Sequence, residues 1–420
     1  MEKLPTGGSR WPGISLLLLV NLVALSFFFS PGTGDISIWQ TWMGEISSRG
    51  IVGGFSHTGT DYPPLAFIIL GLVTHAAEMV GVLPVLVLKG SLLFFLFATA
   101  VCFYWFSRSL LLTATLELCL ILNSVALGYL DIYFAPFLIS GLFLLRRGQL
   151  NAGFLCYAIG CAIKWQPLII LPFVGLYVFR AAKDPAGGKH RLKTQLFPFV
   201  TSAVLVAVPV LVLFGAPAIL DSLKRALTYH KFLSAYALNL EWIETWALHL
   251  FKPEEYGALI NGAIDAFITR DPLLVWPNKI LFYVSYLAVL LAFISRRNTF
   301  ERLVIYSMLG YLAYFNFNTS VHENHLFLIC CLAWVLVLIE PSELVWPFNF
   351  SIAANANLFL FYGLFGQRIN PVLGGFDITL LFAIANLAMF AGFLAHAFKR
   401  DSIRLQMWQS NVSRSSIAGG

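Results

Sequence analysis

Three short polar segments interrupt a chain that is otherwise mostly apolar. They are Gly34-Asp35 followed by Trp39 and Trp42, then Asp61-Tyr62-Pro63-Pro64-Leu65, and far downstream Val321-His322-Glu323-Asn324-His325. Carboxylates accept protons and imidazoles titrate near neutral pH, so these segments carry the groups that acid–base catalysis requires. Ionisable groups cost free energy at a membrane, and a chain that keeps them there is expected to use them.

The composition around these segments is that of a polytopic membrane protein. Of 420 residues, 59% are hydrophobic and 11% are charged, and the mean hydropathy is +0.79. A membrane-spanning helix needs about 20 apolar residues, and such runs recur to the end of the chain. We therefore expect an all-α protein with a single membrane domain over residues 1–420. The net charge of +6 is explained by basic loops at a membrane, so we expect no nucleic-acid partner.

Twelve apolar runs are predicted to span the membrane. They cover residues 14–30, 84–106, 110–127, 131–145, 151–164, 166–180, 196–215, 279–295, 302–318, 326–339, 344–365 and 377–398. The first run lacks a small-x-small cleavage site and is read as an uncleaved anchor. The pair 151–164 and 166–180 is joined at Lys164-Trp165-Gln166-Pro167, where the proline ends or kinks a helix.

Lys and Arg residues set the expected orientation, because they accumulate in short cytoplasmic loops. The basic clusters lie at 146–147, 183–193, 296–297 and 399–404. With a cytoplasmic N-terminus, all of them and the C-terminus fall inside. The run 65–82 must then lie at the outer interface or re-enter it, since spanning would place every later cluster outside.

This topology gives a first external loop over residues 31–83 and a long external loop over 216–278. The residues that it gathers on the outer face are Asp35, Asp61, Asp131, Lys164, the 322–325 cluster and Arg368. Separate loops converging on one face are how a polytopic enzyme builds a site. Simpler explanations exist: Asp35 as a helix cap, Lys164 as a neutralising partner of Asp131, and His322 with His325 as markers of the water interface.

The alternative class is a multi-pass transporter or flippase of lipid-linked or polar substrates. Transporters place ion and substrate sites near the bilayer midplane, on broken helices related by internal repeats. No convincing repeat is seen, and Lys89, Asp131 and Lys164 fall near the outer ends of predicted spans. The sequence therefore favours an enzyme.

The order of the three polar segments resembles that of a known family. The motifs Gly34-Asp35-x-x-x-Trp39-x-x-Trp42-Met43, Asp61-Tyr62-Pro63-Pro64-Leu65 and Val321-His322-Glu323 are similar to those of polyprenyl-phosphate-sugar-dependent glycosyltransferases of the GT-C superfamily. The likeness is greatest to the endoplasmic-reticulum glucosyltransferases that act on the lipid-linked oligosaccharide and to their prokaryotic relatives. Gly128-Tyr129-Leu130-Asp131 and Lys164-Trp165-Gln166-Pro167 also resemble GT-C signatures, whereas Asn324 stands where the glucosyltransferases carry a Lys.

The resemblance implies a GT-C fold and transfer of a hexose, glucose or mannose, from a polyprenyl or dolichyl phosphate to a lipid-linked glycan or other acceptor. Asp35 maps to the catalytic base of the family, and transfer is direct, with inversion and without a metal or other cofactor. The lipid-phosphate sugar is a co-substrate. It also implies the bacterial plasma membrane or the endoplasmic-reticulum membrane, according to the organism.

The remaining site residues are assigned from the chemistry of such a donor. The departing phosphate needs cations, for which the candidates are Lys164, Arg368, His322 and His325, with Glu323 orienting a His. Aromatic rings suited to stacking on sugar faces are Trp39, Trp42, Tyr62, Trp165 and Trp242. The predicted substrate-binding set is completed by Asp61, Asp131 and Gln166.

Overall fold

The computed structural model describes the backbone of residues 11–182, 188–228 and 231–417, without the side chains of 182, 188–195 and 402–417. The basic residues between 183 and 193, and Arg404, therefore lie outside the residues whose side chains are described. Elsewhere the chain is almost entirely helical, as the composition predicts.

The helices of the first half, in chain order, are α1 (Trp11–Ser26), α2 (Asp35–Thr58), α3 (Pro64–Val80), α4 (Pro84–Ser107), α5 (Leu110–Ile121), α6 (Ala135–Arg146), α7 (Leu150–Ile163), α8 (Leu171–Ala182) and α9 (Gly188–Phe214). Those of the second half are α10 (Ala216–Thr228), α11 (Leu240–Phe251), α12 (Pro253–Tyr256), α13 (Pro272–Ser295), α14 (Phe300–Phe317), α15 (Phe327–Ile339), α16 (Val345–Tyr362) and α17 (Thr379–Ile417). A short antiparallel hairpin pairs β1 (Val372–Leu373) with β2 (Phe376–Asp377).

A helix occupies each range predicted as a span. Among the described residues, five helices are long and apolar enough to cross a membrane. They are α4, the part of α9 from Leu196, α13, α16 together with the turn before it, and the part of α17 up to Asp401. Several others are apolar but shorter, including α1, α3 and α7. The protein is thus an all-α, membrane-embedded chain.

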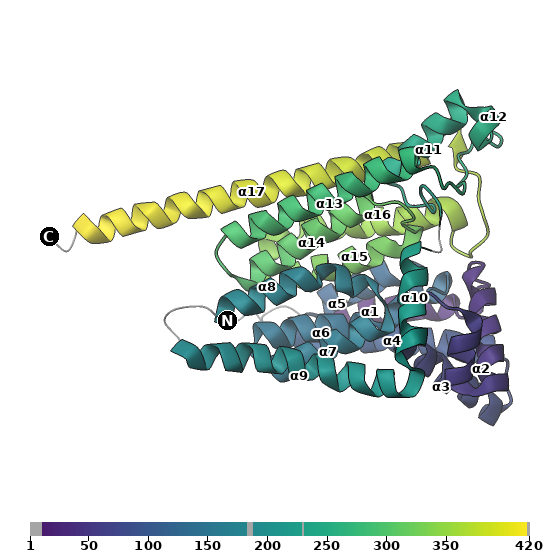
Figure 1. Ribbon diagram of the computed structural model, residues 1–420, viewed down its shortest axis with the longest axis horizontal. Helices are drawn as coiled ribbons and strands as arrows, with labels where there is room; N and C mark the ends of the chain where they lie inside the picture. Colours follow the sequence, from purple (N-terminus) through teal and green to yellow (C-terminus); the bar gives the residue numbers. More distant parts are fainter. Residues whose placement is uncertain (1–10, 183–187, 229–230, 418–420) are drawn as a thin grey trace.

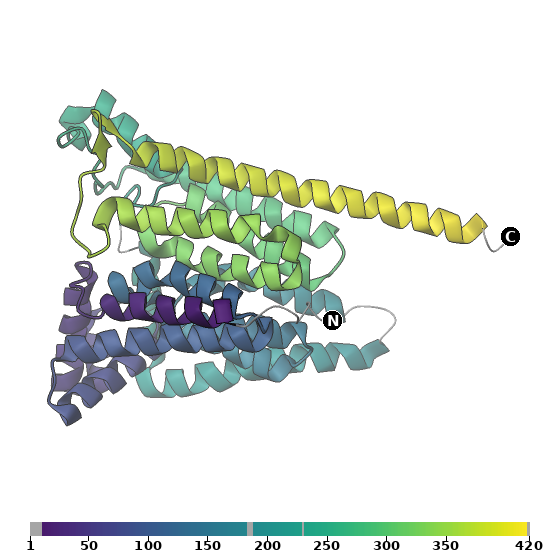
Figure 2. The same ribbon diagram turned by 180° about the vertical axis from the view of Figure 1, so that it is seen from behind.

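The long helices run side by side, and α2, α3, α11 and α12 gather at one end of the bundle (Figure 1). The amphipathic helix α10 crosses the long helices near that same end. The C-terminal part of α17 projects from the opposite end (Figure 2). The first turn of α1 faces that opposite end. We call the end that carries α2 and α3 the loop end and the opposite one the tail end. The run 65–82 forms α3, which lies at the loop end.

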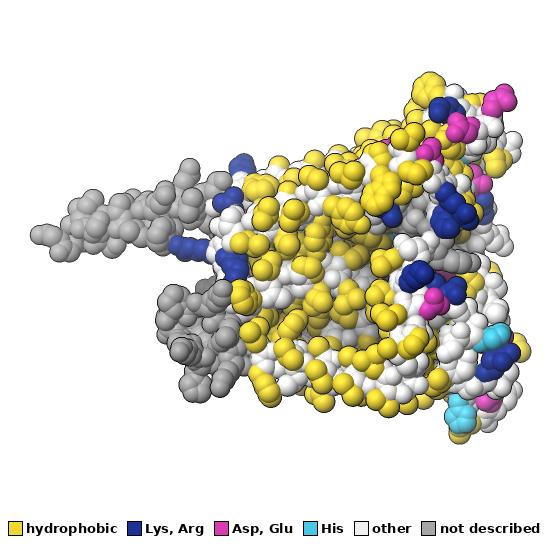
Figure 3. Space-filling model, in the orientation of Figure 1, with side chains coloured by type: hydrophobic (Ala, Val, Ile, Leu, Met, Phe, Trp, Pro, Cys, Tyr) yellow, Lys and Arg dark blue, Asp and Glu magenta, His cyan; other side chains and the backbone are white. Residues whose placement is uncertain are grey.

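Apolar side chains form a band across the middle of the bundle. Figure 3 shows this band in yellow on one face, with the charged side chains of that face toward the two ends. Exposed leucines and valines of α9 and α13 contribute to it. In contrast, α15 is buried along its length from Phe327 to Val337 and forms the centre of the core. A soluble protein rarely exposes so much continuous apolar surface, and a bilayer provides the solvent that it needs.

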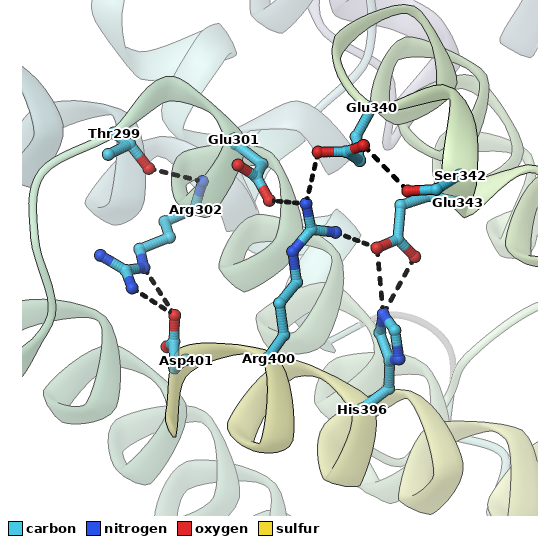
Figure 4. Close-up of polar contacts among 9 residues, drawn as sticks. All are labelled: Thr299, Glu301, Arg302, Glu340, Ser342, Glu343, His396, Arg400 and Asp401. Carbon is cyan, nitrogen blue, oxygen red and sulfur yellow. Dashed lines mark hydrogen bonds and ion pairs between the residues drawn. The ribbon is translucent and has the colours of Figure 1, made fainter. Parts of the chain in front are cut away.

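An ion-pair network at the tail end fastens α17 to the bundle (Figure 4). Arg400 lies among three carboxylates, those of Glu301, Glu340 and Glu343. His396 Nε2 lies 3.0 Å from Glu343 Oε2. The residue after Arg400, Asp401, accepts from Arg302 at 2.6 Å. These pairs join α17 to the start of α14 and to the connection between α15 and α16.

Candidate functional site

The polar segments singled out in the sequence meet at the loop end of the bundle. Each lies where one helix gives way to the next: between α1 and α2, between α2 and α3, between α5 and α6, between α7 and α8, and between α14 and α15. We call this group the polar cluster, and its members are Asp35, Asp61, Tyr62, Tyr129, Asp131, Lys164, Gln166, His322, Glu323, Asn324 and His325.

Two loops packed on one another position Asp35. Thr33 N donates to Leu127 O at 2.9 Å, and Trp39 Nε1 donates to Gly128 O at 2.9 Å. Gly128 has φ +86°, and a Cβ there would lie 2.3 Å from Ile36 Cδ1. Only glycine permits both this backbone conformation and this approach. The first turn of α2 is therefore held against residues 127–128.

Asp35 is half-buried and is the first residue of α2, whose N-cap position is Gly34. The N-cap of the helix is thus not Asp35, so the capping explanation is not supported. Its carboxylate lies within electrostatic reach of Glu323, Tyr129 and Tyr362. A partly exposed carboxylate can take a proton from a hydroxyl group that comes within hydrogen-bond reach.

Lys164 joins three of the predicted segments. Its Nζ lies 2.9 Å from Asp131 Oδ1 and also donates to the hydroxyl of Tyr62. Asn324 Nδ2 donates to the other oxygen, Asp131 Oδ2, at 2.7 Å. Asp131 is fully buried, and these contacts offset the cost of burying its charge.

Three of the five aromatic residues proposed for sugar stacking form one buried group. The rings of Trp39, Trp42 and Tyr62 pack edge to face at centroid distances of 4.8 to 5.6 Å. Lys164 Nζ lies 4.0 Å from the Tyr62 ring centroid. The structure thus gives these rings a packing role around Lys164.

Glu323 and the two histidines form the second half of the cluster. Tyr129 donates to Glu323 Oε1 at 2.5 Å, and Tyr362 donates to the same oxygen at 3.3 Å. His322 Nδ1 lies 3.9 Å from the other oxygen of Glu323, which agrees with the predicted pairing of that Glu with a His. His325 Nδ1 is hydrogen-bonded to the Tyr314 hydroxyl at 2.9 Å.

Gln166 has unused hydrogen-bonding capacity. It follows the break after α7, where Lys164 is extended and a 3₁₀ turn covers Gln166–Ile170. Its side chain is buried, and neither its amide nitrogen nor its amide oxygen has a hydrogen-bond partner among the described residues. Buried polar groups of this kind normally find partners, so Gln166 is suited to binding a polar ligand.

Two predicted residues lie apart from the polar cluster. Arg368 pairs with Asp265 at 2.6 Å and lies over the Tyr236 ring at 5.4 Å. Trp242 is fully buried beside Phe361, and its Nε1 donates to Thr379 Oγ1 at 2.8 Å. Arg368 therefore stabilises the segment 216–278, and the Trp242 ring faces protein.

Sequence reasoning missed Lys89 as a support for the site. Lys89 is 1% exposed, and its Nζ donates to Val125 O at 2.5 Å and to Ala126 O at 3.3 Å. These carbonyls end a π-helical turn, Leu122–Ala126, that leads into the loop carrying Gly128 and Asp131. A lysine inside a long apolar run was the available signal.

No protein-family model matches the chain, and a search of curated proteins finds no match. The functional assignment therefore depends on the residues and their arrangement.

Proposed function

We propose that the protein is a GT-C type glycosyltransferase with about twelve spans that moves a hexose from a polyprenyl or dolichyl phosphate to an acceptor at the loop end. The observation that carries this proposal is the placement of Asp35. A half-buried carboxylate begins α2 beside Glu323 and Tyr129, in the motif order that the resemblance identifies with the catalytic base.

The proposed step is a single displacement at the anomeric carbon. The acceptor hydroxyl oxygen attacks this carbon, and Asp35 takes the hydroxyl proton as the new bond forms. The bond between the anomeric carbon and the phosphate oxygen breaks, and its electron pair leaves with the lipid phosphate. Gln166, buried and able to form further hydrogen bonds, would orient sugar hydroxyls.

The same proposal assigns the loop end to the extracytoplasmic or lumenal face. Lys and Arg side chains at the tail end support a cytoplasmic position for that end. Acidic and His side chains are found with basic ones at the loop end. The membrane is the plasma membrane in a prokaryote or the endoplasmic reticulum in a eukaryote.

The test is incubation of the purified protein with a panel of polyprenyl-phosphate hexoses, followed by mass measurement of extracted lipids and glycans. We expect hexose to be added to an acceptor by the wild-type protein and not by Asp35→Asn. Movement of the lipid-linked donor between leaflets without any new glycosidic product would instead identify a flippase.

A further inference from the structure

A basic cleft lies beside the polar cluster at the loop end. It has a volume of about 610 Å³ and lies between α10 and the two strand-like segments at residues 231–232 and 268–270. The residues that line it are Asp221, Lys224, Arg225, Thr228, Lys231, Phe232, Ile268 and Arg270. Figure 3 shows Lys and Arg side chains gathered over α10, where the apolar band ends.

The charges of this cleft favour an anion. Four of its lining residues are cationic and one is acidic. Asp221 pairs with Arg225 at 2.8 Å. In the part of the chain that the structure describes, Lys224, Lys231 and Arg270 have no ion-pair partner, and all three are exposed. Arg and Lys are the side chains that bind phosphate groups most effectively.

The same cleft also offers apolar surface. Phe232 and Ile268 line it, and Ile268 is 69% exposed. On α10, Leu220 and Leu227 are also largely exposed. Cations next to exposed apolar side chains at the edge of the hydrophobic band suit an amphiphile, in which a phosphate at the surface continues into a hydrocarbon chain.

The cleft shares one wall with the segment that carries Asp61. Ser222 Oγ, on α10, donates to Tyr62 O at 2.7 Å. The guanidinium of Arg225 covers Gly59, where a Cβ would lie 3.0 Å from Arg225 Cζ. Helix α10, which forms one wall of the cleft, therefore also packs on the segment between α2 and α3.

The opposite wall leads to the histidines. Ser320 Oγ donates to Phe232 O at 3.0 Å, and Ser320 N donates to Leu233 O at 3.1 Å. Two residues further along, His322 pairs with Ala235 and Tyr236. The cleft and the polar cluster are thus adjacent parts of one region.

We propose that Lys224, Lys231 and Arg270 bind the phosphate of the lipid-linked donor. This inference rests on the proposed function. It assigns phosphate binding to the cleft and not to Lys164 and Arg368, because these two residues have carboxylate partners. When the sugar departs, a phosphodiester with one negative charge becomes a phosphate monoester with two. Three cations stabilise that added charge, and they do so more strongly in the transition state than in the donor.

The test is binding of farnesyl phosphate, a short polyprenyl phosphate, to the purified full chain. The variant combines Lys224→Gln, Lys231→Gln and Arg270→Gln, and the matched control is Lys252→Gln at the same end of the bundle. We expect farnesyl phosphate affinity to fall by roughly tenfold or more in the triple variant, because charge-assisted contacts to phosphate are about twice as strong as neutral ones. Affinity for farnesol, which lacks the phosphate, should not change.

Two results would overturn the inference. One is unchanged farnesyl phosphate affinity in a triple variant that melts at the wild-type temperature. The other is equal competition by phosphatidylglycerol in lipid nanodiscs or by inorganic phosphate, which would show a general headgroup or ion site. Farnesyl phosphate binding is measured without any sugar transfer, so the two proposals can fail separately. If farnesyl phosphate binds in the cleft and no sugar is transferred, the proposed function fails and the phosphate site stands.

Discussion

Lys164 Nζ lies 2.9 Å from Asp131 Oδ1, although the two residues belong to different helix connections, and Asp131 is fully buried. The contact pairs a cation that the sequence suggested for a departing phosphate with a carboxylate suggested for substrate. Asn324 donates to Asp131, and Lys164 donates to the Tyr62 hydroxyl. The ion pair and these two hydrogen bonds therefore join the segments that surround the proposed site.

We expect Lys164→Met to lower stability strongly, because it leaves Asp131 buried without its cation, a change that typically costs about 3–5 kcal/mol. The double variant Lys164→Met with Asp131→Asn should regain most of the lost melting temperature in detergent and keep farnesyl phosphate affinity. A double variant that is stable but no longer binds farnesyl phosphate would return the phosphate role to Lys164.

Asp35→Asn should reduce sugar transfer by roughly 10²-fold or more, the scale for loss of a general base, since the amide cannot take the acceptor proton. Expression, melting temperature and donor binding should be retained, because the amide has nearly the same shape. The rate of product formation under single-turnover conditions is the measurement. If Asp35→Asn turned over normally and Asp61→Asn did not, Asp61 would be the base.

Removing the cation at the tail end should loosen α17. Arg400→Met leaves Glu301, Glu340 and Glu343 without their shared partner, and we expect a loss of about 1.5–3 kcal/mol, because Glu343 is buried and a hydrogen bond to a charged group contributes about that much. Arg49→Met removes an exposed i,i+4 pair with Glu45 and should cost less than about 1 kcal/mol. Thermal unfolding in detergent compares the two variants, and equal losses would show that the network has no special role.

Labelling of cysteines introduced one at a time tests which side of the membrane each end of the bundle faces. We expect an impermeant thiol reagent to label His57→Cys and Lys252→Cys from outside intact cells or right-side-out vesicles, and to label Gln149→Cys and Ser342→Cys only after permeabilisation. The first two positions are exposed at the loop end and the others at the tail end. The wild-type protein, whose six cysteines lie within helices, gives the background. Labelling of all four positions from one side would contradict the topology.

The segment 216–278 should loosen in acid. Burial alone would raise the pKa of Asp265, but hydrogen bonds from Tyr236 and Arg368 outweigh it and hold the pKa below its ordinary value of 3.8. Stability from this lowered pKa is fully present above about pH 3.8 and is lost as the pH falls through the lower folded-state pKa. The measurement is the hydrogen-exchange protection factor of residues 257–270, which corrects for the pH dependence of the chemical exchange rate. In Asp265→Asn this protection factor should no longer depend on pH in this range. An unchanged protection factor in the wild-type protein down to pH about 2.5 would contradict the prediction.

The sequence by itself determined the class of the protein and the location of its apolar helices, but not of α10, α11 and α12 within residues 216–278. Apolar runs of helical length appear as helices at every predicted range, because a segment without polar side chains must satisfy its backbone internally in a bilayer. The break at Lys164–Pro167 was also predictable, because proline ends or kinks a helix at its own position. The helix α3 was predictable as the apolar run 65–82. Density of charge in an apolar chain likewise identified most of the polar cluster.

Only the tertiary structure decided which of these residues bind each other. Lys164 and Asp131, Asn324 and Asp131, and Arg368 and Asp265 are joined across connections distant in sequence, and nothing local fixes such pairings. The basic cleft is of the same kind: Lys224, Lys231 and Arg270 are ordinary surface residues in the sequence, and they share a cleft because the chain folds 268–270 back beside 231–232. Periodicity and composition act over a few turns, whereas ion pairs and clefts depend on how whole helices pack.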